Sequence, residues 1–377
     1  MLFLCAALIV AASCSLITIR TLIGYSDMHI AYKILISSVI LLGWFGIFPI
    51  HLLQKANIPD AVFAPISFTL YTLMGFVFIL FITLMLRDIV WFGLYGAAKA
   101  LGIGGWHLNP KNLSSLSIAN MIVVVFSILL TGYALYEGHK EPEVKDIFIY
   151  SDKISKNLRI AQISDMHITR ATPDMQVRKL VHQVNGLNPD VVVLTGDTID
   201  DMPAKIEDKL FSLRELSAPY GVYVIMGNHE FYNDIYASKK LFDKLGLKFL
   251  FNGGFHINKS NVFISGIPDM GTMAERINLW RALNKSTKED YTILLSHAPT
   301  IVDGLSRDLV DLVLSGHTHG GQIFPFHILV KQANKYLAGQ YKVNDIDLYV
   351  SRGAGTWGPA MRLFAPSDIV MINLLKK

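Results

Sequence analysis

Seven side chains of the kinds that bind divalent cations recur in the C-terminal part of the chain, and most of them directly follow an apolar run. They are carboxylates, imidazoles and one amide: Asp165, His167, Asp197, Asn228, His297, His317 and His319. Mixed ligand sets of this kind suit manganese, iron or zinc and do not select among them. Two such ions about 3.5–4 Å apart can hold a bridging hydroxide and clamp the attacking and leaving oxygens of a phosphoryl group. The pattern therefore predicts a dinuclear centre for phosphoester hydrolysis.

These motifs differ in how specific each one is by itself. His317 and His319 flank a single residue after an apolar run and precede two glycines, which makes them the strongest signal. Asp165 and His167 are also two residues apart, so their side chains can point the same way, but such a pair is common without a metal. Asp197, taken alone, could be a helix cap or turn residue. The prediction therefore depends on the whole set in order.

Apolar, β-rich runs precede these residues and predict the strands that position them. The runs are Leu158–Ser164, Asp190–Thr195, Gly221–Met226, Val262–Ile267, Tyr291–Ser296 and Val310–Ser315. Pro173–Leu187 and Pro203–Leu216 have apolar residues three and four apart, which is typical of amphipathic helices. Alternating strands and helices indicate an α/β domain, where ligands bind beyond the carboxyl ends of the strands. Leu348–Ser351 and Ile369–Leu374 would extend a second sheet.

The N-terminal region has a different composition, with only six Lys or Arg and four Asp or Glu among residues 1–139. It contains four stretches without a charged side chain: Leu2–Ile19, Ile34–Leu53, Ala61–Leu86 and Ile118–Tyr136. Each is long enough to span a bilayer and shows little polar periodicity, so we expect about four transmembrane helices rather than buried core helices. The first stretch lacks a basic start and a cleavage site, which favours an uncleaved helix over a signal peptide. The apolar, Gly-punctuated segment from Asp88 to Ser117 suits an interfacial or re-entrant segment, or else an ordinary connecting loop.

These boundaries predict a membrane region over 1–139, a linker with a first strand over 140–157 and an α/β domain over 158–377. Basic residues near the helix ends favour placing the first and third connections inside, which would make the domain of this multi-pass protein extracytoplasmic. The opposite orientation is favoured by four lysines that follow the last helix: Lys140, Lys145, Lys153 and Lys156.

Cysteine content and net charge narrow the possible functions further. Cys5 and Cys14 lie in the first apolar stretch, so the domain has no disulfide framework and no thiolate metal site. A net charge of +4 is too small to indicate binding of nucleic acid, and no nucleic-acid partner is expected.

The ordered motifs resemble those of the calcineurin-like metallophosphoesterase superfamily. The matching motifs are Asp165-x-His167, Gly196-Asp197-x-x-Asp200, Gly227-Asn228-His229-Glu230, His297 and Gly316-His317-x-His319. The resemblance spans residues 158–322 and is specific as a set. Gly320-Gly321-Gln322 and the Gly-rich tail at 353–358 are similar to the bacterial membrane-associated branch of that superfamily.

The resemblance implies a four-layer αββα sandwich and a role for each matching residue. Asp165, His167 and His319 would hold one metal ion, Asn228, His297 and His317 would hold the second, and Asp197 would bridge them. By the same analogy His229 would stabilise or protonate the leaving oxygen, and Asp200 would orient His229. Asp201 and Met202 stand where Ser/Thr phosphatases of the superfamily have Arg-Gly, which lowers the expectation of phosphoprotein substrates.

The expected activity is therefore that of a membrane-anchored phosphoester hydrolase, with a phosphodiesterase as the first hypothesis. The bilayer anchor makes lipid-linked or envelope phosphates attractive substrates. A phosphomonoesterase or nucleotide pyrophosphatase is the alternative, and a non-catalytic membrane receptor or scaffold is the alternative of another class. The sequence does not indicate the oligomeric state.

Several other residues are weaker candidates. Arg170, Arg352 and Arg362 could each orient a phosphate, although an ordinary salt bridge is the favoured explanation for any one of them. Trp357 could line the cleft or pack in the core. His182, His256 and His327 lack a strand-end context and are expected to be surface or core residues.

Overall fold

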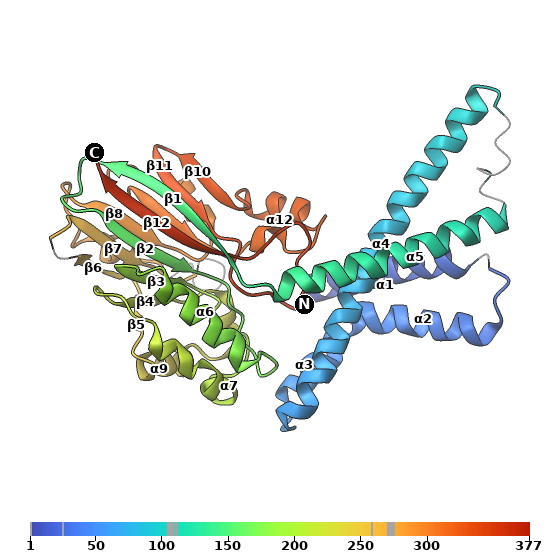
Figure 1. Cartoon of the computed structure of the whole chain (residues 1–377), viewed down its shortest axis with the longest axis horizontal. Coiled ribbons are helices and arrows are strands. Elements are labelled where there is room, and N and C mark those ends of the chain that lie inside the picture. The colour runs from blue at the N-terminus through green and yellow to red at the C-terminus, as the bar shows by residue number, and fades with distance from the viewer. Residues whose placement is uncertain (1, 25, 104–108, 110–111, 258, 270–275) are drawn as a thin grey trace. The chain divides into compact units, whose positions relative to one another are not determined.

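The computed structural model describes the chain except for residues 1, 25, 104–108, 110–111, 258 and 270–275. It divides into two compact units (Figure 1). The first comprises Met1–Tyr136 and Gly358–Met361, and the second comprises Glu137–Trp357 and Arg362–Lys377.

The first unit is helical, as its apolar composition predicts. Its helices are α1 (Leu2–Ile23), α2 (Ile30–Phe45), α3 (Ile47–Lys55), α4 (Asp60–Ala100) and α5 (Leu113–His139). Among the described residues, α4 and α5 are each long and apolar enough to cross a membrane. The pair α2 and α3, which is bent by 57°, would add a third span if it counts as one, and Leu8–Ile23 is a shorter apolar helix. The expected number of four spans therefore stays a prediction.

The first part of the segment from Asp88 to Ser117 is helical and is neither the connecting loop nor the re-entrant segment that the sequence suggests. Asp88–Ala100 continues α4 without a break, so this helix has 41 residues. The part from Asp88 to Ala100 contains Gly93 and Gly96 but no proline, and helix formers such as Leu94, Ala97 and Ala98 outweigh the two glycines. The remainder of the segment lies largely outside the described residues.

The second unit contains two six-stranded sheets of mixed direction. The first has the order β1 (Glu143–Ser151), β12 (Asp368–Lys376), β2 (Leu158–Ile163), β3 (Val191–Thr195), β4 (Val222–Ile225) and β5 (Lys248–Phe249). The second has the order β10 (Gly339–Val343), β11 (Ile346–Val350), β9 (Leu312–Ser315), β8 (Tyr291–Leu295), β7 (Val262–Gly266) and β6 (Gly253–Ile257). Strands β2 to β5 are parallel, as are β7, β8, β9 and β11.

The expectation that Ile369–Leu374 extends a second sheet is wrong. This segment is β12, which lies in the first sheet between β1 and β2. It pairs parallel with β1, which the sequence indicated only as a short strand, and antiparallel with β2. Its side chains from Asp368 to Leu374 are buried on both faces, and a strand covered on both faces belongs in the interior of a sheet.

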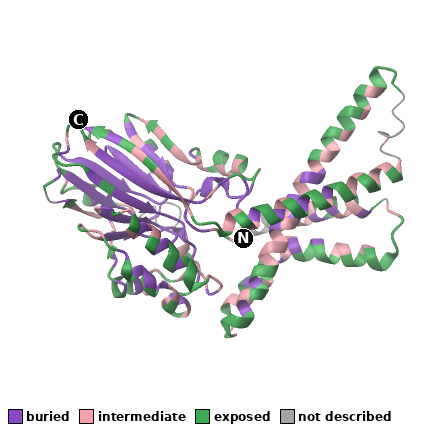
Figure 2. Ribbon diagram, viewed as in Figure 1, coloured by how far each residue is buried: buried purple, intermediate pink, exposed green. Residues whose placement is uncertain are grey.

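The two sheets pack face to face and helices cover their outer faces, which gives the expected four layers (Figures 1 and 2). Ile160, Val193 and Ile225 of the first sheet share one core cluster with Ile293 and Leu314 of the second. Helices α6 (Asp174–Gly186), α7 (Pro203–Leu210) and α9 (Ile235–Lys244) cover the first sheet. The second sheet packs against α11 (Leu279–Leu283) and the 3-10 helix η4 (Pro299–Gly304).

Local sequence explains these covering helices. In α6 the apolar residues Val177, Leu180, Val181 and Val184 are three or four apart, so they form one buried face against the sheet. By contrast, β3 consists of Val-Val-Val-Leu-Thr and is buried throughout, because it lies between a helix layer and the second sheet.

Candidate metal centre

The carboxyl ends of five strands meet at the site. Asp165 and His167 follow β2, Asp197 follows β3, and Asn228 begins the short helix α8 (Asn228–Asn233) after β4. These residues belong to the first sheet. His297 follows β8 of the second sheet, and His317 and His319 follow β9. Because strands of both sheets end here, seven residues that are far apart in sequence converge.

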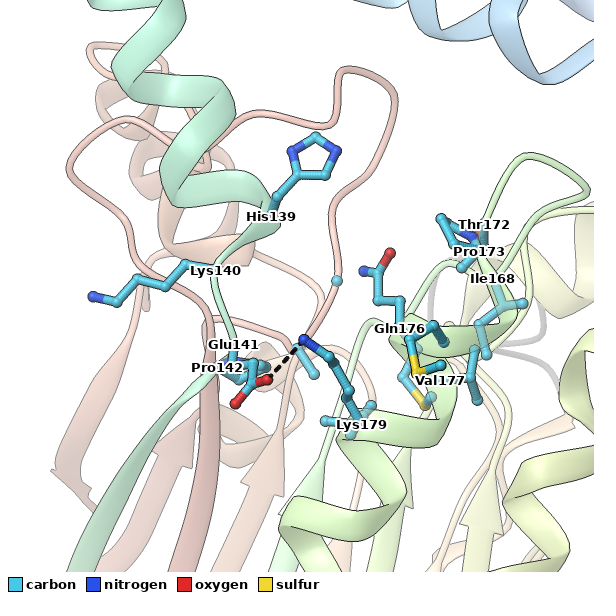
Figure 3. Close-up of a pocket in the computed structure, with 15 residues that line it drawn as sticks. His139, Lys140, Glu141, Pro142, Ile168, Thr172, Pro173, Gln176, Val177 and Lys179 are labelled. Atoms are coloured by element: carbon cyan, nitrogen blue, oxygen red, sulfur yellow. Dashed lines mark ion pairs between the residues drawn. The ribbon is translucent and has the colours of Figure 1, made fainter.

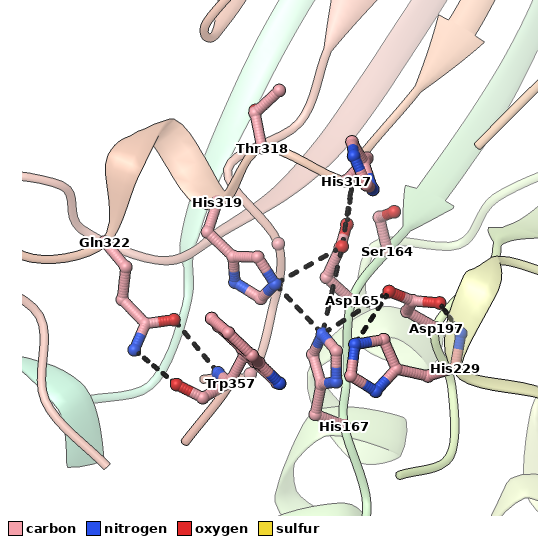
Figure 4. A network of polar contacts seen from close by, with 12 residues as sticks. Ser164, Asp165, His167, Asp197, His229, His317, Thr318, His319, Gln322 and Trp357 are labelled. Carbon is pink, nitrogen blue, oxygen red and sulfur yellow. Dashed lines mark hydrogen bonds and ion pairs between the residues drawn. The ribbon is translucent and has the colours of Figure 1, made fainter. Parts of the chain in front are cut away.

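Asp165, His167 and His319 form one group whose ligand-type atoms lie within 4.8 Å of one another (Figure 4). The Nε2 atoms of His167 and His319 are 2.9 Å apart. The Nε2 atom of His319 lies 3.4 Å from Oδ1 of Asp165. All three residues are buried. This group brings together one carboxylate and two imidazoles, as the sequence predicts.

A second group contains Asp197, His297 and His317, and Asn228 adjoins it. The Nε2 atom of His297 is 3.1 Å from Oδ2 of Asp197 and 3.3 Å from Nδ1 of His317. The amide oxygen of Asn228 lies 3.0 Å from Nδ1 of His317. His297 donates its other ring proton, on Nδ1, to the carbonyl oxygen of Thr195 at 2.8 Å, which leaves Nε2 pointing into the group.

Asp197 lies between the two groups. Its Oδ2 atom is 3.1 Å from His297 of one group and 3.7 Å from Nε2 of His167 of the other. Asp197 also belongs to a third cluster with His167 and His229. A carboxylate in this place can serve ions on both sides.

The spacing of these atoms fits divalent cations. Two ligands of one ion, each about 2.0–2.2 Å from it, stand about 3 Å or slightly more apart. The shorter distances within each group, 2.9–3.4 Å, match this value, whereas Nε2 of His167 lies 4.0 Å from Oδ1 of Asp165. In addition, Nδ1 of His319 is buried without a hydrogen-bond partner among the described residues. The donor set of carboxylate, imidazole and amide oxygen therefore fits the divalent ions that the sequence predicts.

Electrostatic coupling is strong because the groups are buried. Burial by itself raises the pKa of Asp197, but His297 and His167 outweigh it and hold that pKa well below the usual range. Burial lowers the pKa of His297, yet the Asp197 carboxylate raises it well above 6.5. A cation bound at Asp197 would displace the additional proton of His297, because a histidine ligand must be neutral. Burial and the neighbouring His167 lower the pKa of His319 well below 6.5, so His319 is neutral.

Several of these residues have a strained backbone. The φ angle is positive at five of them: Asp165, His167, Asp197, His317 and His319. Positive φ is costly for residues with side chains and concentrates at functional sites. Gly196, at φ 92°, also needs its lack of a side chain, since a Cβ atom there would lie 2.6 Å from the Gly227 nitrogen and 2.7 Å from the His297 ring.

Glu230, to which the sequence assigns no role, holds the loop of Asp197 in place. Its fully buried carboxylate accepts hydrogen bonds from the backbone N–H groups of Asp197, Thr198, Ile199 and Gly227 at 2.7–3.1 Å. These bonds fix the loop of Asp197 against the start of α8. The only available signal was its place directly after Asn228 and His229.

His229 and Asp200 lie beside the two groups and contact each other. Nδ1 of His229 is 2.5 Å from Oδ1 of Asp200. Burial opposes protonation of His229, but the hydrogen bond and charge of Asp200 outweigh it and raise the pKa of His229 to about 9. Asp200 also approaches Nδ1 of His167 at 3.5 Å. His229 is therefore available as a proton donor at neutral pH.

Trp357 lies next to this pair, with its ring centre 6.1 Å from that of His229 (Figure 4). The side chain of Gln322 holds it in place: Nε2 donates to the Trp357 carbonyl oxygen at 2.8 Å, and the Trp357 N–H donates to Oε1 at 2.9 Å. The indole is half-exposed. Of the two roles expected for Trp357, the structure favours lining the site.

Arg362 does not face substrate as the phosphate-orienting hypothesis would require. It is fully buried, and its guanidinium donates to the carbonyl oxygens of His319, Arg352, Gly353, Gly355 and Ala365. Burial lowers the pKa of Arg362 to about 10, so it remains charged at neutral pH. Arg362 thus anchors the loops that carry His319 and the Gly-rich tail.

The remaining weaker candidates make other contacts, although the Arg352 side chain lies against Gly320, next to His319. Arg170 is also buried, and its backbone N–H donates to the Asp201 carboxylate at 3.4 Å. Arg352 is partly exposed, with its guanidinium 3.9 Å from Asp368. His182 is exposed on α6, and His256 pairs with Asp290 at 3.0 Å. His327 stacks on Phe324.

A separate cavity of about 200 Å³ lies behind the loop of Met166 and Ile168, between α6 and the segment that precedes β1 (Figure 3). Lys179 of α6 and Glu141 form an ion pair of 3.3 Å at its rim. Nearby, the Gln183 side chain donates to the Pro142 carbonyl oxygen at 2.8 Å. These contacts hold the segment before β1 against the domain.

Comparison with known proteins agrees with this geometry. Residues 158–321 match the calcineurin-like phosphoesterase family. An uncharacterized metallophosphoesterase of Helicobacter pylori is 38% identical over 269 residues, which are 69% of this chain and 72% of the relative. One of Campylobacter jejuni is 34% identical over 282 residues, 74% of this chain and 75% of the relative. A Danio rerio protein named transmembrane protein with metallophosphoesterase domain is 30% identical over 271 residues, 67% of this chain and 62% of the relative.

The chain therefore belongs to the calcineurin-like phosphoesterase family and is a metal-dependent phosphoester hydrolase. It combines this domain with apolar N-terminal helices that include two candidate membrane spans in the described part of the chain. Relatives from Danio rerio and Bos taurus are likewise named transmembrane proteins.

Proposed function

We propose that this chain is a multi-pass membrane phosphodiesterase with a dinuclear metal centre that cleaves lipid-linked or envelope phosphodiesters. The observation that supports this most directly is the convergence of two ligand groups, one on each side of Asp197, from the strand ends of both sheets. Paired groups of this kind suit two divalent ions better than one.

We assign the ligands from the two groups. Asp165, His167 and His319 would hold one ion, and Asn228, His297 and His317 would hold the other. Asp197 would serve both. When bound, the ions supply Lewis acidity that activates water and neutralises charge on the phosphoryl oxygens.

The chain's own side chains supply the remaining chemistry. His229, held by Asp200 and protonated at neutral pH, donates its Nε2 proton to the leaving oxygen. Asp200 keeps the ring oriented so that Nε2 faces the Asp197 carboxylate, 3.9 Å away. Trp357 forms an apolar wall beside the reacting groups and restricts the approach of water.

The choice of a membrane substrate follows from the architecture. Apolar helices that fix an enzyme to a bilayer raise its local concentration of lipid phosphates. Basic residues flank the first and third helix connections, which supports an extracytoplasmic position of the domain. Envelope lipids and polymers with phosphodiester bonds are accessible from that side.

The test is hydrolysis by the full-length protein in detergent, with bis(p-nitrophenyl) phosphate as diester and p-nitrophenyl phosphate as monoester. We expect turnover with manganese, loss of turnover with chelator, and preference for the diester. Asp197→Asn should lower diester turnover on the order of a hundredfold or more, because it removes charge from both ion sites. His182→Asn, on the exposed face of α6, is the matched control and should keep full turnover.

Bound metal should be counted in the same samples. About two ions per chain in the wild type and fewer in Asp197→Asn would support the dinuclear assignment. A folded, metal-loaded protein that cleaves neither ester would contradict the proposed activity. Preference for the monoester would replace the diesterase by a phosphomonoesterase.

A further inference from the structure

The loops beside the metal centre carry an exposed apolar surface. It comprises Phe324, Phe326, Ile328, Leu329 and Phe364, and we call it the α12 surface. Ile328 and Leu329 are each 59% exposed, and Phe364 is 68% exposed. All eight residues of α12 (His327–Asn334) are described, and none of them is buried, so this short helix displays its apolar side chains rather than packing them. The surface of a soluble domain rarely carries so many large apolar side chains close together unless they have a function.

The α12 surface is one continuous structure built from two loops. Ile323 and Leu363 form a parallel bridge, in which the Phe324 N–H donates to the Leu363 carbonyl oxygen at 3.1 Å. The rings of Phe324 and Phe364 are 5.8 Å apart in an edge contact. Phe364 has a φ of 60°, which is costly for a bulky residue, so the fold holds this ring outward against its backbone preference.

This surface directly adjoins the site. The Leu363 N–H donates to the carbonyl oxygen of Gln322, whose side chain holds Trp357 beside His229. His319, the first residue of the 3-10 helix η5 (His319–Gly321), belongs to the ligand group, and four residues separate it from Phe324. A molecule bound at the α12 surface can therefore extend into the metal centre.

Chain connectivity limits how far the α12 surface lies along the chain from the end of α5. Three residues separate the end of α5 from the start of β1, which limits the gap to about 14 Å at 3.3–3.6 Å per residue. The N–H of Glu143, the first residue of β1, donates to the carbonyl oxygen of Ser367 at 2.9 Å. Ser367 is three residues from Phe364, so the α12 surface begins about 10 Å along the chain from the point where the membrane helix enters the domain.

We propose that the α12 surface inserts into the bilayer at the boundary of headgroups and acyl chains, and that it delivers a lipid phosphoester to the metal centre. Insertion buries aromatic and aliphatic side chains at the depth where interfacial helices lie. The exposed Lys331 on α12 can contact headgroup phosphates from the same position. Insertion is inferred from the exposed apolar side chains alone, whereas delivery of substrate rests on the proposed function.

The first experiment measures insertion without using activity. Full-length protein with Cys5→Ser and Cys14→Ser would carry one new cysteine, Leu329→Cys, labelled with an environment-sensitive fluorophore. It would be reconstituted into phosphatidylcholine and phosphatidylglycerol vesicles with brominated acyl chains. The control is Trp280→Cys, an equally apolar and 76% exposed position on α11, which packs against β6 and β7 at the far edge of the second sheet.

We expect brominated lipid to quench the label at position 329 and to leave the label at position 280 unquenched. Equal quenching at both positions, or none at 329, would overturn insertion. Crosslinking between copies through position 329 without quenching would mean that a second copy of the chain covers the surface, and it would overturn the proposal as well.

The second experiment tests delivery. The double variant Ile328→Asp and Leu329→Asp should lower the ratio of turnover on a vesicle-borne phosphodiester lipid to turnover on the soluble aryl diester by about tenfold or more, because membrane binding scales with buried apolar area. Trp280→Asp should leave the ratio unchanged. An unchanged ratio in the double variant would overturn delivery. Wild-type protein that cleaves neither substrate would contradict the proposed function, whereas quenching would still decide insertion.

Discussion

Single residues of the site act through their neighbours. His229 has a high pKa despite its burial, chiefly because Asp200 is 2.5 Å away, and His319 is neutral because burial and His167 disfavour its charge. Asp197 remains ionised against the cost of burial because imidazoles surround it. Each of these properties is set by a contact with a residue on a different loop.

Asp200→Asn tests the role of His229 through pH. Protonated His229 is the active form, so wild-type kcat/KM on the aryl diester should fall as pH rises through about 9. Removing the Asp200 charge and hydrogen bond lowers the pKa of His229, which moves this decline to lower pH. A pH profile at saturating manganese measures the shift. A decline that stays in place or moves to higher pH would exclude His229 as the proton donor.

Glu230→Gln tests whether the Glu230 carboxylate holds the Asp197 loop in place. Glutamine keeps the shape but has no charge, and its amide nitrogen would face backbone N–H groups that now find a carboxylate oxygen. We expect manganese affinity to fall about 10–100-fold, as for other groups that orient metal ligands. Metal titration of activity measures this, with Glu215→Gln on the surface as the matched control. Unchanged affinity would show that Glu230 has no part in holding the site.

Among the elements, the loops after the strands have a less favourable backbone conformation than the strands themselves. Positive φ angles occur in the loops after β2, β3 and β9, and the surrounding structure must hold them. Arg362 provides much of this restraint, since its guanidinium joins the backbone of His319 to that of Gly353 and Gly355. A buried side chain therefore connects the second sheet's ligand loop with the Gly-rich tail.

Arg362→Met should destabilise the protein and weaken metal binding together. Methionine fills much of the space but leaves buried carbonyl oxygens without donors, at about 1–3 kcal/mol each. We expect the free energy of unfolding to fall by roughly 3 kcal/mol or more. Arg352→Met, a partly exposed arginine with one long ion pair, should cost under about 1 kcal/mol. Equal thermal midpoints for the two variants would show that the Arg362 bonds add little.

At the scale of the whole molecule, the metal centre lies where two sheets meet. The first sheet supplies Asp165, His167, Asp197 and Asn228, and the second supplies His297, His317 and His319. Ions bound between them would link the sheets, so metal binding and folding of the second unit should be coupled.

Chelation should therefore lower thermal stability. An ion present at one hundred times its dissociation constant stabilises the folded state by about 2.7 kcal/mol, or roughly 5–10 °C for a domain of this size. Thermal unfolding of the full-length protein with manganese and with chelator measures this difference. It should shrink strongly in Asp197→Asn, which lacks the bridging charge. The same large difference in that variant would mean that the stabilising ions bind elsewhere.

The sequence by itself determined the chemistry and the local elements. Ligand types and their positions after apolar runs depend on neighbours along the chain, so the strands and helix α6 were predictable, and the seven ligand-type residues after those strands could be proposed as a set. The apolar N-terminal stretches were equally plain because a bilayer span is a local property of composition.

Only the tertiary structure decided how these parts meet. Burial of two sheet faces against each other placed β12 in the first sheet rather than the second and brought His297 against Asp197. It also placed Glu230 and Arg362 where backbone groups needed partners, and it left the α12 surface exposed. These features arise from contacts between segments far apart in sequence, whose packing no local pattern encodes.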